Sequence, residues 1–285
     1  MTGAPQVNPT VARRELAMIF RALREQQKRS LEEVSSHLGV SVPQASRLDT
    51  GARGFRPEDV RRLADWYGLP AAELPRLLVL AEESRRRGWW QQVEVPPSYR
   101  TLIGMEQAAE SINEYGGLVI PGLLQTRQFA EAATAAVVLD IQPERIRQLV
   151  DVRMRRQEVL ERGRPPELWV ILDEAVLART TGGSGVMLGQ LEHLVTSATR
   201  PHITIQVIGF DYGLYPGQAG HFILLGMGGN LPDVIYTEDL IQISDSSEAD
   251  EVRNVRKLWD SLRAIALSPR ASVERIEQYA GRLRK

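Results

Sequence analysis

The sequence contains no cysteine, only four histidines and no long apolar segment. Without cysteine the chain can form neither a disulfide framework nor a thiolate metal site. Because no run of 18 or more apolar residues is present, the sequence predicts no membrane-spanning helix. The opening stretch MTGAPQVNPTVARREL lacks the apolar core of a secretion signal. We therefore expect a cytoplasmic protein with no metal and no membrane contact.

Signatures of catalysis are missing as well. The sequence has no HExxH, GxSxG or Walker pattern. The glycine-rich TTGGSGVMLGQ lacks the lysine of a phosphate-binding loop, and we expect a turn before a helix there. Asp173 and Glu174 follow the apolar run LWVIL, where α/β enzymes often place carboxylates, but Asp173 also suits a helix cap, which we prefer. We expect no enzymatic activity and no cofactor.

The charge that is present is divided unevenly along the chain. Residues 1–90 hold 15 Lys and Arg against 11 Asp and Glu, a net charge of +4. Residues 91–285 hold 20 against 25, a net charge of −5. A basic first part and an acidic second part are compatible with one end that meets nucleic acid.

The basic part is patterned as a bundle of about five helices. Asn8 and Pro9 form a typical helix start, and Leu16 and Phe20 continue an apolar stripe at helical spacing. Ser30 with Glu33 and Ser41 with Gln44 are two capping boxes on either side of a glycine turn. Pro43 falls in the first turn of the second of these helices, where its missing N–H costs little.

The stretch SLEEVSSHLGVSVPQASRLDTG, residues 30–51, resembles the core of the phage-repressor (XRE/Cro) class of helix-turn-helix domains. The following RPEDVRRLADWYGL resembles the fourth helix of that class, and the match spans roughly residues 8–80. The resemblance implies that the third helix enters the major groove of double-stranded DNA. It places Val42, Pro43, Ser46 and Arg47 at the base edges.

Among these residues, Arg47 can pair bidentately with guanine and Val42 can pack against a thymine methyl. We expect phosphate contacts from residues near helix ends and loops, namely Ser41, Gln44, Arg53 and Arg56. Arg53 and Arg56 could instead be solvated loop charges. The motif as a whole could also be a helical protein–protein module.

Residues 1–88 are thus predicted to form the DNA-binding domain, 89–100 a junction, and 101–285 one α+β domain. Helical patterns cover 101–113, 125–137, 143–162, 184–199, 248–266 and 269–283, and strand patterns cover 118–120, 167–172, 202–210, 220–226 and 233–239. Two loops of this domain could line a pocket or receive a partner. Their candidate residues are Tyr115, Gln125, Tyr215 and Phe222, which could equally be packing and turn residues.

The second domain carries its own resemblance, in RRRGWW, VIPGLLQTRQFAEA, LWVILDEAVL and ITIQVIGFDYGLYPGQAGHFILL. These motifs are similar to the C-terminal domain of a large actinobacterial regulator family that includes WhiJ-type developmental regulators. The resemblance implies a transcription factor, often paired with a small protein encoded nearby. It brings no established ligand or catalytic residue.

The function expected from the sequence is a transcriptional regulator, with repression as its output and with a homodimer as the DNA-binding form, because one short recognition helix buries little surface. Two alternatives stay open. In the first, the protein is an antitoxin-like module that neutralises a small partner and autoregulates through DNA. In the second, the C-terminal domain senses a ligand or is an enzyme.

Overall fold

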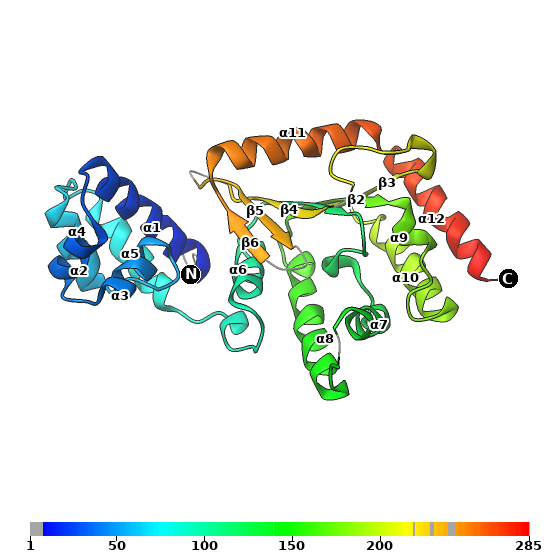
Figure 1. Ribbon diagram of the computed structural model, residues 1–285, viewed down its shortest axis with the longest axis horizontal. Coiled ribbons are helices and arrows are strands. Elements are labelled where there is room, and N and C mark those ends of the chain that lie inside the picture. The colour runs from blue at the N-terminus through cyan, green and yellow to red at the C-terminus, as the bar shows by residue number, and fades with distance from the viewer. Residues whose placement is uncertain (1–7, 139, 219, 229–230, 239–242, 285) are drawn as a thin grey trace. The chain divides into compact units, whose positions relative to one another are not determined.

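The computed structural model describes residues 8–138, 140–218, 220–228, 231–238 and 243–284 (Figure 1). The chain forms two compact units, one from residues 1–94 and 103–108, the other from residues 95–102 and 109–285. The helix α6 (Pro97–Glu106) contributes residues to both. The predicted order, an all-helical N-terminal region followed by an α+β region, is confirmed.

The first unit is a helical bundle whose helices follow the caps in the sequence. The Asn8 side chain accepts a hydrogen bond from the Thr10 amide at 2.8 Å, and Pro9 is the first helical residue. The helices before α6 are α1 (Pro9–Gln26), α2 (Leu31–Leu38), α3 (Val42–Asp49), α4 (Pro57–Trp66) and α5 (Leu74–Arg85). Their apolar faces meet in one core, which includes Leu16, Phe20, Val34, Leu38, Ala45, Leu48, Phe55, Val60, Leu63 and Leu77.

The second unit is built on a mixed six-stranded sheet with the order β3-β2-β1-β4-β5-β6. Strands β1, β2 and β3 are parallel, and β4, β5 and β6 add to them antiparallel. The strands are β1 (Ser111–Gly116), β2 (Glu167–Asp173), β3 (Ile203–Ile208), β4 (His221–Gly226), β5 (Val234–Glu238) and β6 (Ile243–Ser246). The remaining helices are α7 (Arg127–Val137), α8 (Pro143–Gln157), α9 (Glu174–Ala178), α10 (Ser184–Ser197), α11 (Ala249–Ile265) and α12 (Pro269–Leu283). None of the described helices is long and apolar enough to cross a membrane.

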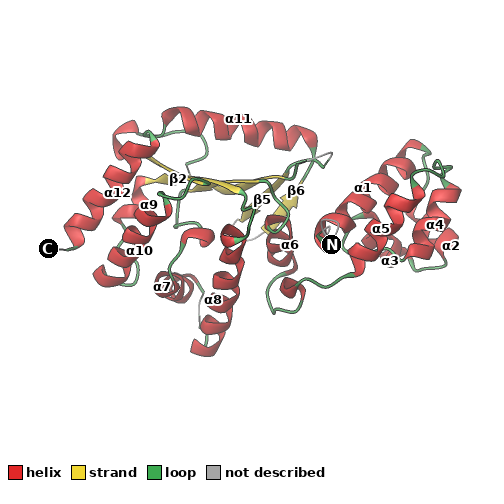
Figure 2. Ribbon diagram, turned by 180° about the vertical axis from the view of Figure 1, so that it is seen from behind, coloured by secondary structure: helices red, strands yellow, loops and turns green. Residues whose placement is uncertain are grey.

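Helices cover both faces of this sheet. The long helix α11 lies across one face, and α7, α8 and α10 lie on the other (Figures 1 and 2). Under α11, Trp259 and Leu262 pack with Tyr115 of β1, Ile171 of β2 and Phe222 of β4. The sheet is therefore the middle layer of three.

The outer edge of β3 is closed by the chain that joins α11 to α12. The Leu267 amide donates to the Val207 carbonyl at 2.9 Å, and the Val207 amide donates to Ser272 Oγ at 2.9 Å. Gln206 of β3 also donates through Nε2 to the Leu267 carbonyl at 2.8 Å. These bonds occupy the backbone N–H and C=O of Val207, one of the positions at which another strand would pair with β3.

Two details of the sequence prediction were wrong. Residues 118–120 form no strand, and residues 111–113, predicted to end a helix, instead begin β1. This strand lies between β2 and β4 in the interior, and it carries the buried Glu114 directly before the buried Tyr115, so it lacks the alternation expected of a half-buried strand. The short polar strand β6, with the sequence ISDS, was not predicted.

Candidate nucleic-acid interface

Helices α2 and α3 and the turn between them are fixed by local hydrogen bonds. At the start of α2, the Glu33 amide donates to Ser30 Oγ at 3.2 Å and the Ser30 amide donates to Glu33 Oε2 at 2.7 Å. Gly39 ends the helix with a positive φ of 68°, a conformation that glycine adopts without strain. Arg62 of α4 donates to the Leu38 carbonyl at 3.0 Å, so the turn is held from outside as well.

Helix α3 presents one face to the core and another to solvent. Ala45 and Leu48 are buried in the core of the first unit. On the other side Val42 is 37 % exposed, Pro43 and Arg47 are exposed, and Ser46 is half-buried. The four residues predicted to contact bases thus lie on the accessible part of one helix, where apolar side chains stand at its start and a cation one turn later.

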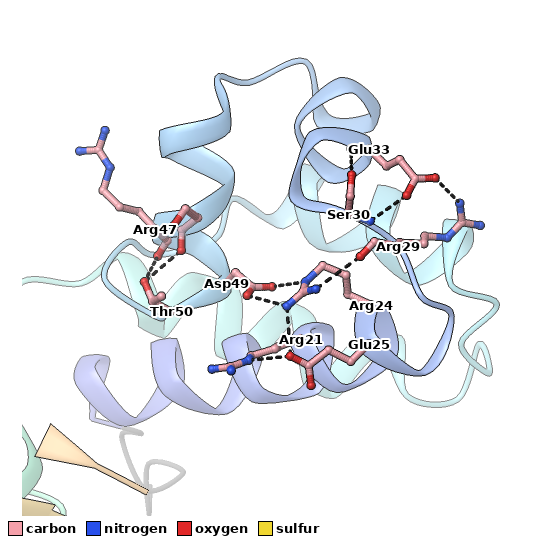
Figure 3. A network of polar contacts seen from close by, with 10 residues as sticks. Arg21, Arg24, Glu25, Arg29, Ser30, Glu33, Arg47, Asp49 and Thr50 are labelled. Carbon is pink, nitrogen blue, oxygen red and sulfur yellow. Dashed lines mark hydrogen bonds and ion pairs between the residues drawn. The ribbon is translucent and has the colours of Figure 1, made fainter. Parts of the chain in front are cut away.

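Arg47 is held so that only the end of its side chain is free. Its Nε donates to the Pro43 carbonyl at 3.1 Å, and the described residues offer no partner to its two terminal nitrogens. Figure 3 shows its guanidinium group pointing away from the bundle. A guanidinium with its Nη groups free can donate two parallel hydrogen bonds to guanine O6 and N7.

The C-terminal end of α3 is tied to α1 by a pair that the sequence analysis missed. Arg24 Nε donates to Asp49 Oδ1 at 2.7 Å and Arg24 Nη2 donates to Asp49 Oδ2 at 3.0 Å (Figure 3). The two side chains are only 15 % and 14 % exposed. The hydrogen bond that Arg24 donates to Asp49 raises the pKa of Arg24 above its ordinary value. The sequence contained an indication of this pair. Arg24 continues the i, i+4 stripe of Leu16 and Phe20 that faces the core, and an arginine at such a position requires a carboxylate partner.

The four residues predicted to contact phosphate have different environments. The Ser41 amide donates to Gln44 Oε1 at 3.3 Å, so these two residues cap α3. Arg53 is half-buried, and its guanidinium has no partner among the described residues. Its amide donates to the Arg47 carbonyl at 3.0 Å, which places it next to the end of α3. Arg56 is exposed and lies 3.5 Å from the Glu58 carboxylate.

Charge distinguishes the start of α3 from those of its neighbours. The first turn of α2 carries two carboxylates and so does the first turn of α4, whereas the first turn of α3 carries none. A carboxylate at a helix start competes with a phosphate for the same N–H groups and repels it. Among these three helices, α3 is the one whose start can approach a phosphate without such repulsion.

The four candidate residues of the second unit are all buried. Tyr115 and Tyr215 are hydrogen-bonded through their hydroxyls at 2.8 Å, and Tyr215 donates to the Asp173 carboxylate. Gln125 donates to the Ile120 carbonyl at 2.6 Å, and Phe222 packs on Tyr115. Burial raises the pKa of Tyr115 to about 12 and raises that of Tyr215 above its ordinary value. This burial agrees with the packing alternative rather than with a pocket lining.

Asp173, the last residue of β2, and Glu174 are both engaged in structural bonds. Asp173 Oδ1 accepts the Ala175 amide at 2.7 Å and so caps α9, as the sequence indicates. Glu174 accepts hydrogen bonds from the Phe210 amide at 2.8 Å, Arg275 at 2.6 Å and Tyr279 at 2.9 Å. Burial opposes ionisation of Glu174, but these bonds outweigh it and lower the pKa of Glu174. In the described part of the chain, no group of three or more acidic or histidine side chains is arranged to hold a metal ion.

Comparison with known proteins agrees with the division of the chain into an N-terminal helical region and a C-terminal α+β region. Residues 15–77 match the model of a family described as a helix-turn-helix domain. Residues 99–278 match the model described as "Domain of unknown function (DUF5753)". No curated protein and no solved structure matches the chain. Because the second match covers more than half of the chain, and follows a bundle whose α2 and α3 form the helix-turn-helix, the protein belongs to the DUF5753 family.

Proposed function

We propose that the protein is a sequence-specific, DNA-binding transcriptional regulator whose helix α3 reads the major groove. The observation that carries this proposal is the outer face of α3, where Val42, Pro43 and the free end of Arg47 are exposed next to one another. The helix-turn-helix match supports DNA binding, and in domains of that kind the second helix of the motif enters the major groove.

The half-site expected from this face contains a guanine under Arg47 and a thymine beside Val42. Arginine pairs with the two acceptors of guanine, whereas valine contributes apolar contact with the thymine methyl. Ser46 is placed to assist Arg47, and Ser41, Gln44, Arg53 and Arg56 position the helix on the backbone. The protein binds as a homodimer on two half-sites about one DNA turn apart.

The finer assignment rests on the sequence resemblance. It implies the XRE class and the actinobacterial WhiJ-type regulators. We also propose a cytoplasmic location and repression as the output. The second unit dimerises and receives a signal or a small protein encoded nearby. We assign it no catalysis, and this is supported by the structural bonds that engage both Asp173 and Glu174.

The proposal is tested by selecting binding sites from random DNA with the full-length protein and with Arg47→Ala. We expect the wild type to select a site with an invariant guanine in each half. We expect Arg47→Ala to lose preference at that base by about 1–3 kcal/mol, roughly 5- to 150-fold, because the bidentate pair is lost.

The matched control is Arg270→Ala, which removes one positive charge from α12 of the other unit, where the side chain is 91 % exposed. The control should select the wild-type site. Selection of the same guanine by Arg47→Ala would contradict the assignment of Arg47. Absence of any selected sequence with the wild type would contradict the proposed function itself.

A further inference from the structure

Two loops of the second unit expose large apolar side chains at one end of the sheet. They are the loop after β1, with Leu118 and Val119, and the loop between β3 and β4, with Phe210, Tyr212 and Leu214. Leu214 is 90 % exposed and Phe210 is 58 % exposed. We call these five residues the edge patch. Single exposed apolar residues are ordinary, but a group of this size at one place indicates contact with another molecule.

The sheet topology brings the two loops together. Because β1, β2 and β3 are parallel and β4 is antiparallel to β1, the loop from β3 to β4 crosses the carboxyl ends of β2 and β1. The loop after β1 starts at the same edge. A Cβ atom at Gly117 would lie 2.9 Å from the Gln218 carbonyl and 2.8 Å from the Tyr115 hydroxyl, so the loops touch at this glycine.

Buried bonds hold the loop from β3 to β4 in place. The Phe210 amide is bound by Glu174, and Tyr215 is bound by Asp173 and Tyr115. The ring of Tyr212 lies 6.2 Å from the ring of Tyr215 in an edge-to-face arrangement. The exposed side chains therefore stand on a backbone that is already ordered, which lowers the entropy cost of binding.

The charge of the patch indicates its occupant. Residues 117–120 and 209–220 contain one charged residue, Asp211, although residues 91–285 carry a net charge of −5. A basic partner would be expected to find several carboxylates here. The second unit of another copy carries the same −5, so two second units repel each other least where a face with little charge meets its equal.

We propose that the edge patch is the surface through which two copies of this chain associate across a twofold axis. Each patch would bury the partner's Phe210, Tyr212 and Leu214, and aromatic and large apolar side chains are the usual energetic centre of such contacts. The choice of a second copy rests in part on the proposed function, since reading two half-sites requires two recognition helices.

The experiment is sedimentation equilibrium of the full-length chain, wild type against Leu214→Glu, with Val137→Glu as the matched control. Val137 is 78 % exposed at the end of α7, on neither loop. We expect a wild-type dimer and an increase of at least about tenfold in the dissociation constant for Leu214→Glu, because each dimer receives the substitution twice. Val137→Glu should dimerise as the wild type does, and circular dichroism should show all three folded alike.

A monomeric wild type would overturn the proposal, and so would a Leu214→Glu dimer of unchanged strength or an equal loss in Val137→Glu. DNA binding is measured separately on a single half-site. A monomeric Leu214→Glu that retains the guanine preference there supports both proposals. A wild type that dimerises through the edge patch but prefers no DNA sequence supports the surface and contradicts the proposed function.

Discussion

At the scale of single residues, Arg24 and Asp49 determine how α3 is held against α1. Their carboxylate and guanidinium are joined by two hydrogen bonds and are largely shielded from water. Arg24 Nη1 also donates to the Arg29 carbonyl at 3.4 Å, at the turn that leads into α2. The pair therefore connects the helix that carries Arg47 to two other parts of the bundle.

We expect Arg24→Ala and Asp49→Ala each to lower the free energy of unfolding by about 1–3 kcal/mol, because the first leaves Asp49 without its partner and the second leaves Arg24 with only Glu25 and the Arg29 carbonyl. The double variant should lose less than the sum of the two, with a coupling of at least about 0.5 kcal/mol. Urea unfolding of the four proteins measures this cycle. Additive losses would show that the pair contributes no interaction of its own.

At the scale of elements, the turn between α2 and α3 depends on Gly39. A Cβ atom at Gly39 would have no neighbour within 4 Å, so a substitution there meets no steric obstacle and only the positive φ of 68° opposes it. The effect of a side chain at this position is thus a measure of backbone strain alone.

Gly39→Ala should destabilise the protein by about 1 kcal/mol, because alanine is strained in the left-handed region. The control is Gly281→Ala in α12, which also has open space but an ordinary helical backbone. That change should be neutral or stabilising by up to about 1 kcal/mol. Thermal unfolding distinguishes the two, and a loss of equal size at both glycines would contradict the argument from φ.

A feature of this protein could be predicted from the sequence when the residues that determine it lie close together along the chain. The caps at Asn8, Ser30 and Ser41 lie within a few residues of the groups they satisfy, so the bundle and the outer face of α3 could be read from the sequence. The strand β1 could not, because its identity depends on strands that pair with it from 56 to 115 positions away. The edge patch was missed for the same reason, since exposure of Leu214 is set by which strands the loop joins.

At the scale of the whole molecule, the charge is divided between the two parts of the chain. The first 90 residues carry +4 and the rest carry −5. Binding of DNA by the basic part releases counterions, and the affinity falls as salt rises. The acidic part has no electrostatic attraction to the DNA phosphates, so the salt dependence of the affinity reports the contacts of the basic part.

We expect Arg53→Ala to reduce the slope of the logarithm of the binding constant against the logarithm of salt by about 1 per half-site, because it removes one phosphate contact. Arg56→Ala should reduce it less, since Glu58 already lies 3.5 Å from its guanidinium. Fluorescence anisotropy over a salt series measures both. An unchanged slope in Arg53→Ala would place that residue away from the DNA backbone.

The bonds from Leu267 and Ser272 to β3 have a consequence for the size of the assembly. Because the backbone groups of Val207 are already bonded to its own chain, a strand from a neighbour cannot form a continuous ladder along β3. If two copies join through the edge patch, each copy contributes the same surface. Neither copy then has another edge patch exposed for a third copy. Association through the edge patch then stops at the pair, and the bonds at Val207 hinder extension of the sheet beyond β3.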